Sequence, residues 1–311
     1  MPDQGADAPT VIGMEHEEDF MKSKVFNMFA ALVLTSSGVS AADQKVAVRF
    51  QANVGNEKLA CGRTYSGVGT TGSKLSPRDF RFYVHNVALI DESGKAIPLL
   101  LDQDGKWQLD DVALLDFEDG TAGCINGTPD VNDRVTGTVP EGHYTGLRFT
   151  LGVPFQKNHT DLTTQPPPLN LTALSWVWNA GRKFARLDFS STGMPRGYAI
   201  HLGSTGCTPN KVKTAPPAQC SEPNRPEIEL AGFDPATDVV IADLAALLKD
   251  TTIDTNQEKT AAGCMSSPDD SDCAGIFANL GLPFAGKPAG KQTFFHRGVA
   301  AESKPSIGVG N

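Results

Sequence analysis

Side chains suited to redox or metal chemistry gather between Trp176 and Cys207. Trp176 and Trp178 stand two residues apart, and His201 follows a short apolar run that leads to Cys207. If the tryptophan segment is extended, this spacing puts both indoles on one face. Indoles can be oxidised and imidazole binds transition metals, so the segment indicates a redox or metal site. The alternative is ordinary aromatic packing within a core.

Two further histidines are candidate ligands. His159 lies in a polar loop, where Asp161 could orient its imidazole. His85 shares the strand parity of Val87 and Leu89, which also fits a histidine buried in the core. No H-E-x-x-H or comparable metal motif is present.

Charge and motifs argue against several classes of function. The net charge of −9 disfavours nucleic acid and anionic membrane surfaces as partners. No G-x-S-x-G occurs. The G-x-G-x-x-G of 67–72 lacks the strand and helix that a dinucleotide site requires, and we expect a flexible loop there. We therefore expect a protein that is not an enzyme.

The N-terminal region predicts export. Residues 1–20 are acidic and unpatterned, and we interpret them as an extension upstream of the true start at Met21. Residues 21–41 combine lysines, a short apolar run and small residues, as in a secretory signal peptide. We expect no stable membrane insertion after its cleavage. The mature chain then comprises one domain, 42–286, and a loosely ordered tail, 287–311.

Six cysteines in an exported chain indicate disulfides. Six cysteines allow fifteen connectivities. Pairing between neighbours in the sequence would join Cys61 to Cys124, Cys207 to Cys220 and Cys264 to Cys273.

The elements that must position these residues are mainly strands. Alternating or apolar runs predict strands at 45–54, 79–91, 97–101, 112–117, 145–153, 227–230 and 239–247. A short helix is expected at 274–280. Strands at this spacing, with turn residues between them, indicate an all-β fold. We expect an antiparallel β-sandwich stapled by disulfides, with few short helices.

Several separate motifs resemble one known family. They include Asp79 to Val84, Leu114 to Gly120 with Cys124, Gly152 to Phe155 followed by Asn158-His159, the Trp176-x-Trp178 pair, His201 to Cys207, and Gly263 to Ser266 with Cys273. Their order along the chain is similar to that of the MbnP-like proteins, also described as metallo-mystery-pair four-cysteine-motif proteins.

The resemblance implies a periplasmic copper-binding protein that is paired with a di-haem MauG-like (MbnH-like) cytochrome peroxidase. In such pairs the haem protein oxidises a tryptophan of its partner to kynurenine, and the modified protein binds copper. The role would be copper acquisition or handling. The alternative hypothesis is an exported carbohydrate-binding or adhesion module whose surface tryptophans stack on sugars.

Carried over to this chain, Trp176 and Trp178 are the candidates for modification, and the motifs do not choose between them. His201 matches the histidine before Leu-Gly-Ser and is the first candidate metal ligand, and His159 matches the Asn-His motif and is the second candidate. His85 stands where family members commonly carry serine, so it is either a variant ligand or a core residue. Arg182 departs from a family tyrosine without altering the tryptophan pair.

Overall fold

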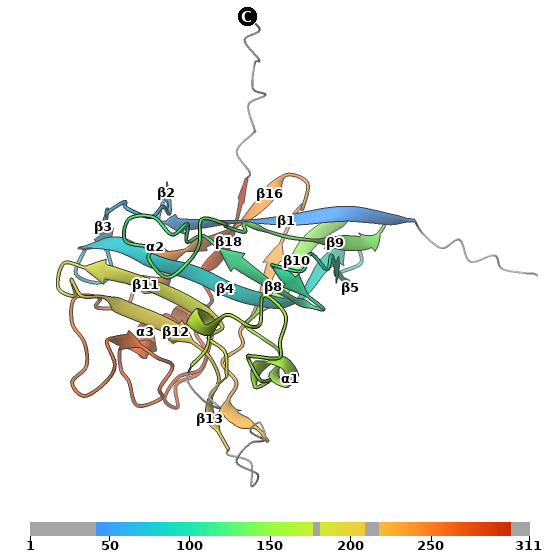
Figure 1. Cartoon of the computed structure of the whole chain (residues 1–311). Coiled ribbons are helices and arrows are strands. Elements are labelled where there is room, and N and C mark those ends of the chain that lie inside the picture. The colour runs from blue at the N-terminus through green and yellow to red at the C-terminus, as the bar shows by residue number, and fades with distance from the viewer. Residues whose placement is uncertain (1–41, 177–180, 209–217, 300–311) are drawn as a thin grey trace, which may run out of the picture. The chain divides into compact units, whose positions relative to one another are not determined.

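The computed structural model describes residues 42–176, 181–208 and 218–299, which form two sheets and a small hairpin (Figure 1). The predicted upstream extension, the signal peptide, Trp178 and residues 300–311 lie outside the described residues. Those predictions stay predictions. In the part of the chain that is described, no helix is long and apolar enough to cross a membrane.

The smaller sheet has the strand order β18-β16-β1-β9-β6, with β2 paired to β1. Its central strand begins where the predicted mature chain begins and keeps the alternating pattern seen in the sequence. Its strands are β1 (Asp43–Val54), β2 (Glu57–Lys58), β6 (Leu100–Leu101), β9 (Arg134–Pro140), β16 (Asp238–Asp243) and β18 (Phe295–Val299).

The larger sheet has the order β15-β10-β4-β11-β12-β17, and its long strand β4 also pairs with β3, β5 and β8. Strand β7 pairs with β8. Its strands are β3 (Tyr65–Val68), β4 (Ser73–Asp91), β5 (Ala96–Pro98), β7 (Gln108–Leu109), β8 (Val112–Asp116), β10 (Tyr144–Leu151), β11 (Ala185–Ser191), β12 (Tyr198–Leu202), β15 (Glu227–Ala231) and β17 (Gly263–Cys264).

Aromatic side chains fill the space between the two sheets. Phe50 of β1 meets Phe82 of β4 edge to face, with ring centroids 6.0 Å apart. Phe149 of β10 meets Phe295 of β18 in the same manner at 5.1 Å. All four rings are at most 3% exposed, and such pairs add to the stability that burial of their area provides. The core of the sandwich therefore lies between β1 and β4.

The all-β sandwich is confirmed, but its strands are not purely antiparallel. Strand β1 runs parallel to β16 and antiparallel to β9, and β12 runs parallel to β17. Parallel neighbours need a long crossover, and β16 and β17 both reach their partners only after long intervening segments. The sheets are therefore mixed, which local alternation within a strand could not indicate.

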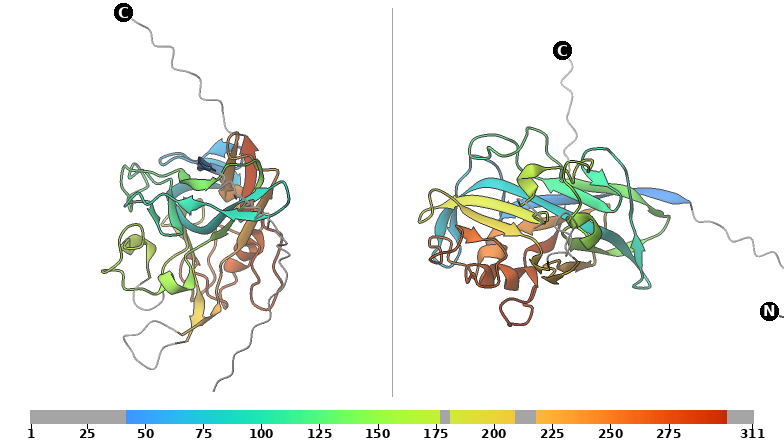
Figure 2. Two further views of the ribbon diagram at one scale, coloured as in Figure 1. Left: turned by 90° about the vertical axis from the view of Figure 1, so that its right-hand side faces the viewer. Right: turned by 60° about the horizontal axis from the view of Figure 1, so that its bottom comes forward.

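Few helices are present, as predicted. They are α1 (Phe155–Asn158), the 3₁₀ turn η1 (Thr172–Leu174), α2 (Leu244–Leu248) and α3 (Cys273–Leu280). Both α1 and the hairpin of β13 (Thr205–Cys207) and β14 (Cys220–Glu222) lie on the side of the larger sheet that faces away from β1, which Figure 2 shows from two directions. The segments that carry the candidate residues thus cover the outer face of that sheet.

Two local predictions were wrong. The Gly-rich stretch 67–72 is not a free loop, because Val68 pairs with Ser73 across a tight turn between β3 and β4. The tail is ordered as far as Val299, because β18 adds to the edge of β16 and places Phe295 in the core. Its short apolar pair, Phe294-Phe295, was the available signal.

Candidate functional site

Trp176 lies at the end of the 3₁₀ turn η1, outside any strand. Its backbone N–H donates to the carbonyl of Gly181 at 3.2 Å, and an isolated bridge joins Ser175 to Arg182. Backbone hydrogen bonds of an antiparallel bridge therefore hold Trp176 opposite Gly181. Trp178 lies outside the described residues, so the prediction that both indoles share a face stays a prediction.

The indole of Trp176 presses against the backbone of β12 just after the strand ends. A Cβ added to Gly203 would lie 2.2 Å from Cζ3 and 2.4 Å from Cη2 of Trp176. No real Cβ tolerates such distances, so this position requires glycine. The tryptophan ring therefore packs directly on the glycine of the His-Leu-Gly motif.

His201 lies on the same face of the larger sheet as Gly203. Along β12, the side chains of Tyr198, Ile200 and Leu202 enter the core, each at most 2% exposed. Because side chains alternate along a strand, His201 and Gly203 both face the opposite side. Alternate positions are about 6.6 Å apart. Trp176 and His201 therefore occupy adjoining positions on the outer face of the larger sheet.

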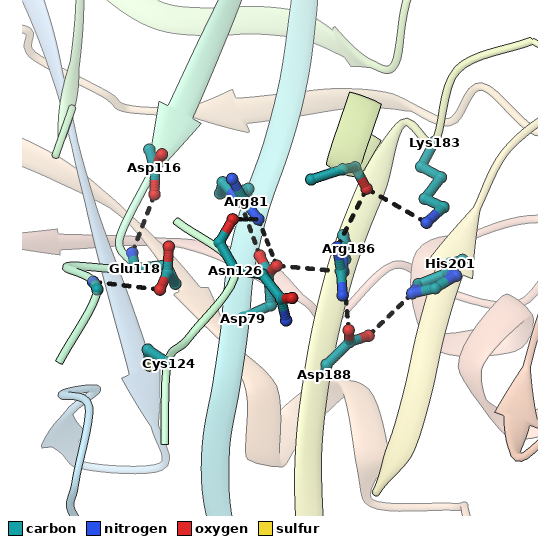
Figure 3. Close-up of polar contacts among 12 residues, drawn as sticks. Asp79, Arg81, Asp116, Glu118, Cys124, Asn126, Lys183, Arg186, Asp188 and His201 are labelled. Atoms are coloured by element: carbon teal, nitrogen blue, oxygen red, sulfur yellow. Dashed lines mark hydrogen bonds and ion pairs between the residues drawn. The ribbon is translucent and has the colours of Figure 1, made fainter. Parts of the chain in front are cut away.

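A half-buried carboxylate holds the imidazole of His201. Nε2 of His201 lies 3.0 Å from Oδ1 of Asp188 on the neighbouring strand β11, and Nε of Arg186 donates to Oδ2 of Asp188 at 2.8 Å (Figure 3). Burial alone would raise the pKa of Asp188, but the hydrogen bond and charge of His201, with Arg186, outweigh it and lower the pKa. Asp188 is thus an ionised acceptor, and Nε2 of His201 is its donor.

The backbone around His201 is held as well. The Ser266 hydroxyl donates to the carbonyl of His201 at 2.9 Å and accepts from the backbone N–H of Gly203 at 3.2 Å. Ser266 follows β17 and belongs to the Gly-Cys-Met-Ser motif. This motif therefore clamps the strand end on which Trp176 rests.

The Asp188 pair is one end of a charged row across the sheet. Asp79 of β4 accepts from Arg81 Nε at 2.8 Å and lies 3.1 Å from Nε of Arg186. Figure 3 shows Asp116 and Glu118 continuing the row beyond Arg81. Burial raises the pKa of Asp116 to about 7, against the opposing hydrogen bond from Glu118 and charge of Arg81. His201 is therefore joined through Asp188 and Arg186 to the other charged side chains of this row.

His159 lies in a different setting, directly after α1. Its Nε2 is 3.0 Å from the side-chain nitrogen of Asn158, 3.5 Å from Sγ of Cys220 and 4.0 Å from Sγ of Cys207. Asp161, which the sequence suggested as its partner, accepts instead from the backbone N–H and hydroxyl of Thr163, both at 2.9 Å. Among the described contacts, Asn158 orients the ring.

His85 is a buried strand residue, 4% exposed. Its Nδ1 lies 2.8 Å from the carbonyl of Gly152. Burial is the main cause that lowers the pKa of His85, so the ring is neutral at pH 7. Its setting agrees with the core alternative considered from the sequence.

The three candidate histidines do not converge on one point. Within 42–176, 181–208 and 218–299, a single group of three or more histidine, cysteine or acidic residues has ligand atoms that all lie within 4.8 Å of one another. It consists of His159, Cys207 and Cys220. His85 lies four positions further along β4 than Arg81, which is level with Arg186 and His201. The structure thus brings His201 near Trp176, His159 near a disulfide, and His85 near neither.

The cysteines pair as neighbours in the sequence. The disulfides join Cys61 to Cys124, Cys207 to Cys220 and Cys264 to Cys273. The first ties the loop after β8 to the loop after β2, the second crosslinks β13 to β14, and the third fastens α3 to β17. All six cysteines are used.

Sequence reasoning missed Asp188 and Asn158, the residues that hold the two imidazoles. Asp188 alternates with Leu187 and Phe189 in a strand whose apolar positions are buried. The available signal was that Asp188 and Arg186 are both charged and stand two residues apart, on the same face of the strand. Asn158 stood beside His159 in the motif, and only the tertiary fold shows that its side chain is completely buried.

Comparisons with known proteins agree with this architecture. The profile of the MbnP family matches residues 43–266. Among solved structures, the chain is similar to MbnP from Methylosinus trichosporium, with 33% sequence identity and a TM-score of 0.73 over 84% of this chain and 100% of that one. No curated protein sequence matches the chain.

Proposed function

We propose that this chain, which belongs to the MbnP family, is an exported copper-binding protein whose tryptophan is oxidised to kynurenine. Family membership suggests a copper-related role. The oxidation, the copper site and the periplasmic location are our proposals. Three disulfides fit a protein that matures in an oxidising compartment.

The contact between Trp176 and Gly203 carries the proposal. The ring of Trp176 packs on Gly203, which is the next position after His201 on the same face of the larger sheet. Opening the indole to kynurenine yields an aniline-type amine, which can join an imidazole as a nitrogen ligand. Nitrogen ligands of this kind suit copper. The two motifs that the family shares thus meet at one place.

The Asp188–His201 pair suits metal binding. When Nε2 of His201 donates to Asp188, the other ring nitrogen, Nδ1, is unprotonated in the neutral imidazole and can bind a metal. Carboxylates that hold the second nitrogen of a ligating histidine fix its tautomer and raise its basicity. In this arrangement Asp188 would position His201, and His201 would bind copper.

The oxidant in this proposal is a di-haem MauG-like partner, as the resemblance implies. Trp176 is half-buried rather than enclosed. Electron transfer between proteins does not require the ring to touch the haem, so this burial is compatible with oxidation from outside. The protein would then be the substrate of an enzyme and a binding protein itself.

A copper titration tests this function. The chain is purified after expression alone and after co-expression with its di-haem partner, and each sample is titrated with copper under identical conditions. We expect tight binding in the co-expressed sample only, and loss of that binding in His201→Ala. His143→Ala is the matched control, because His143 is an exposed histidine paired with Glu92.

Equal copper binding with and without the partner would contradict the role of tryptophan oxidation. A sugar-array hit by a protein that binds no copper in either sample would favour the carbohydrate-binding alternative instead.

A further inference from the structure

The disulfide between Cys207 and Cys220 differs from the other two in its exposure. Both of its cysteines are half-buried, and they face each other directly across the β13–β14 hairpin. In each of the other two disulfides at least one cysteine is buried: Cys61 is half-buried but Cys124 is 1% exposed, and Cys264 and Cys273 are at most 1% exposed. A thiolate from outside can therefore reach the hairpin disulfide more easily than the other two.

His159 lies against this disulfide with an unprotonated nitrogen. The backbone N–H of Arg182 donates to Oδ1 of Asn158 at 2.8 Å, which identifies the other amide atom as the NH₂ group. That NH₂ lies 3.0 Å from Nε2 of His159 and therefore donates to it. The same nitrogen faces Sγ of Cys220 at 3.5 Å and Sγ of Cys207 at 4.0 Å.

We propose that reduction of the Cys207–Cys220 disulfide creates a metal site made of two thiolates and the imidazole of His159, and that this site takes a soft ion, Cu(I) above all. Thiolate ligands select Cu(I) and Zn(II) among common biological metals. This site is distinct from the one proposed at Trp176 and His201, and it needs no oxidised tryptophan.

The reductant is a dithiol, such as the two-cysteine centre of a thiol–disulfide oxidoreductase. One of its thiolates attacks a sulfur of the pair, forms a mixed disulfide and releases the other cysteine. Its second thiol then displaces the remaining cysteine and closes the reductant's own disulfide. Two electrons and two protons pass from the dithiol to Cys207 and Cys220. The metal ion displaces those two protons when it binds.

On the histidine side, the present geometry is close to a metal-bound state for Sγ of Cys220 and wider for Sγ of Cys207. With the zinc–sulfur distance of about 2.3 Å and the zinc–nitrogen distance of about 2.0 Å as a guide, a tetrahedral arrangement puts the nitrogen and each sulfur about 3.5 Å apart. The observed separation of Nε2 from Sγ of Cys220 is 3.5 Å, and that from Sγ of Cys207 is 4.0 Å.

Two adjustments complete the site. The sulfurs, which are bonded at present, must separate to about 3.8 Å by rotation of the two half-buried side chains. His159 must also exchange the Asn158 donor for the metal ion.

The first experiment asks which disulfide opens. The folded chain, expressed without the haem partner, is treated with a limiting amount of a phosphine reductant, alkylated and mapped by peptide mass spectrometry. We expect alkylation at Cys207 and Cys220 while the other four cysteines stay protected. Opening of all three disulfides together, or of Cys61–Cys124 or Cys264–Cys273 first, would overturn the proposal.

The second experiment measures Cu(I) binding by the same selectively reduced chain under anaerobic conditions, in competition with bicinchoninate. We expect one equivalent of Cu(I), a thiolate-to-copper absorption band in the ultraviolet, and sulfur and nitrogen neighbours in X-ray absorption. The unreduced chain should show none of these.

Two substitutions identify the ligands. His159→Ala retains the disulfide and should weaken Cu(I) binding at least about tenfold, since even loss of an outer-shell partner costs that much, whereas His143→Ala should bind like the parent. Equal affinity in His159→Ala would overturn the proposal. Because all samples carry unmodified tryptophans, failure here leaves the copper site at Trp176 and His201 standing, and failure of that site leaves this one standing.

Discussion

The two imidazoles on the outer face of the larger sheet are held in opposite ways. His201 is fastened by the ionised carboxylate of Asp188 and is part of a buried row of charges. His159 is held by the neutral amide of Asn158 and lies against a half-exposed disulfide. In our proposal, opening of the Cys207–Cys220 disulfide changes the second arrangement, whereas the first involves no cysteine. One protein can thus carry one constitutive and one conditional donor.

The largest expected change in copper affinity comes from a substitution on the constitutive side. Asp188→Asn leaves Arg186 without one of its two carboxylate partners and replaces the charged acceptor of His201 with a neutral amide oxygen. Breaking a fully buried ion pair costs about 3 to 5 kcal/mol. Asp188 and Arg186 are half-buried, so we expect a smaller loss, about 2 kcal/mol, in the free energy of unfolding measured by urea denaturation.

Copper affinity of the co-expressed protein should fall about 10- to 100-fold in the same variant, as it does when other outer-shell partners are removed. The control is Glu92→Gln, which removes the carboxylate of an exposed histidine pair and should change neither quantity. A stable Asp188→Asn protein with unchanged copper affinity would contradict the role of this pair.

The charged row also predicts a pH dependence. The pKa of Asp116 is about 7 in the folded chain, mainly because of burial, and 3.8 is its ordinary value. Between these values the folded state keeps a proton that the unfolded state releases, so the contribution of Asp116 to stability is fully present below about pH 4 and is lost as the pH rises to about 7. A tenfold change in an acid dissociation constant corresponds to about 1.4 kcal/mol of free energy.

Asp116→Asn cannot ionise, and it should therefore gain up to about 4 kcal/mol on the parent between pH 4 and pH 8. The measurement is urea denaturation of both proteins across this range. Parallel stability profiles would show that Asp116 does not titrate in this way and that the row sets a weaker field than we describe.

A smaller effect tests the contact between Trp176 and Gly203. In Gly203→Ala the new methyl group would overlap the Trp176 indole and crowd the carbonyl of Arg182 at 3.0 Å. Overpacking of this kind costs about 1 to 3 kcal/mol, and kynurenine formation at Trp176 should fall because the ring is displaced.

The matched control for that variant is Gly142→Ala, since the nearest atom to its new methyl group would be 3.6 Å away on Tyr144. Stability and modification both equal to the parent in Gly203→Ala would contradict the contact on which our proposed function rests.

The smallest effect compares the disulfides. Loop entropy predicts that the crosslink over 13 residues between Cys207 and Cys220 stabilises less than the one over 63 residues between Cys61 and Cys124, by about 1.4 kcal/mol. Paired serine substitutions measured by thermal unfolding test this order. If the Cys207–Cys220 disulfide proved the more stabilising, its reduction would destabilise the fold more than expected. That result would argue against a metal site that forms when this disulfide opens.

Much of the fold could be predicted from local pattern, because strand alternation is written into neighbouring residues. The strands around Val48, Val84 and Phe149 follow their apolar runs, and local cysteine pairing gives all three disulfides. Strand β4 starts earlier than predicted, at Ser73, although Pro77 cannot donate a ladder hydrogen bond. A register shift on β11 opposite Pro77 accommodates it.

The site was less predictable because its contacts are set by strand register and long-range packing. Asp188 and His201 are 13 residues apart in sequence and lie near each other only because β11 and β12 pair as they do. His159 reaches Cys220 across 61 residues. Motif resemblance identified these histidines as candidates, but no local pattern could show that they serve two separate places.

The most direct test of the central claim is peptide mass spectrometry of the tryptophan segment from protein made with its di-haem partner. Our account predicts that the peptide gains one oxygen and loses one carbon, as conversion to kynurenine requires, and that fragmentation places the change in the Trp176–Trp178 pair. The same protein should bind copper through His201. Unmodified tryptophans in cells that demonstrably express the haem partner would contradict the account and leave Trp176 as a packing residue on Gly203.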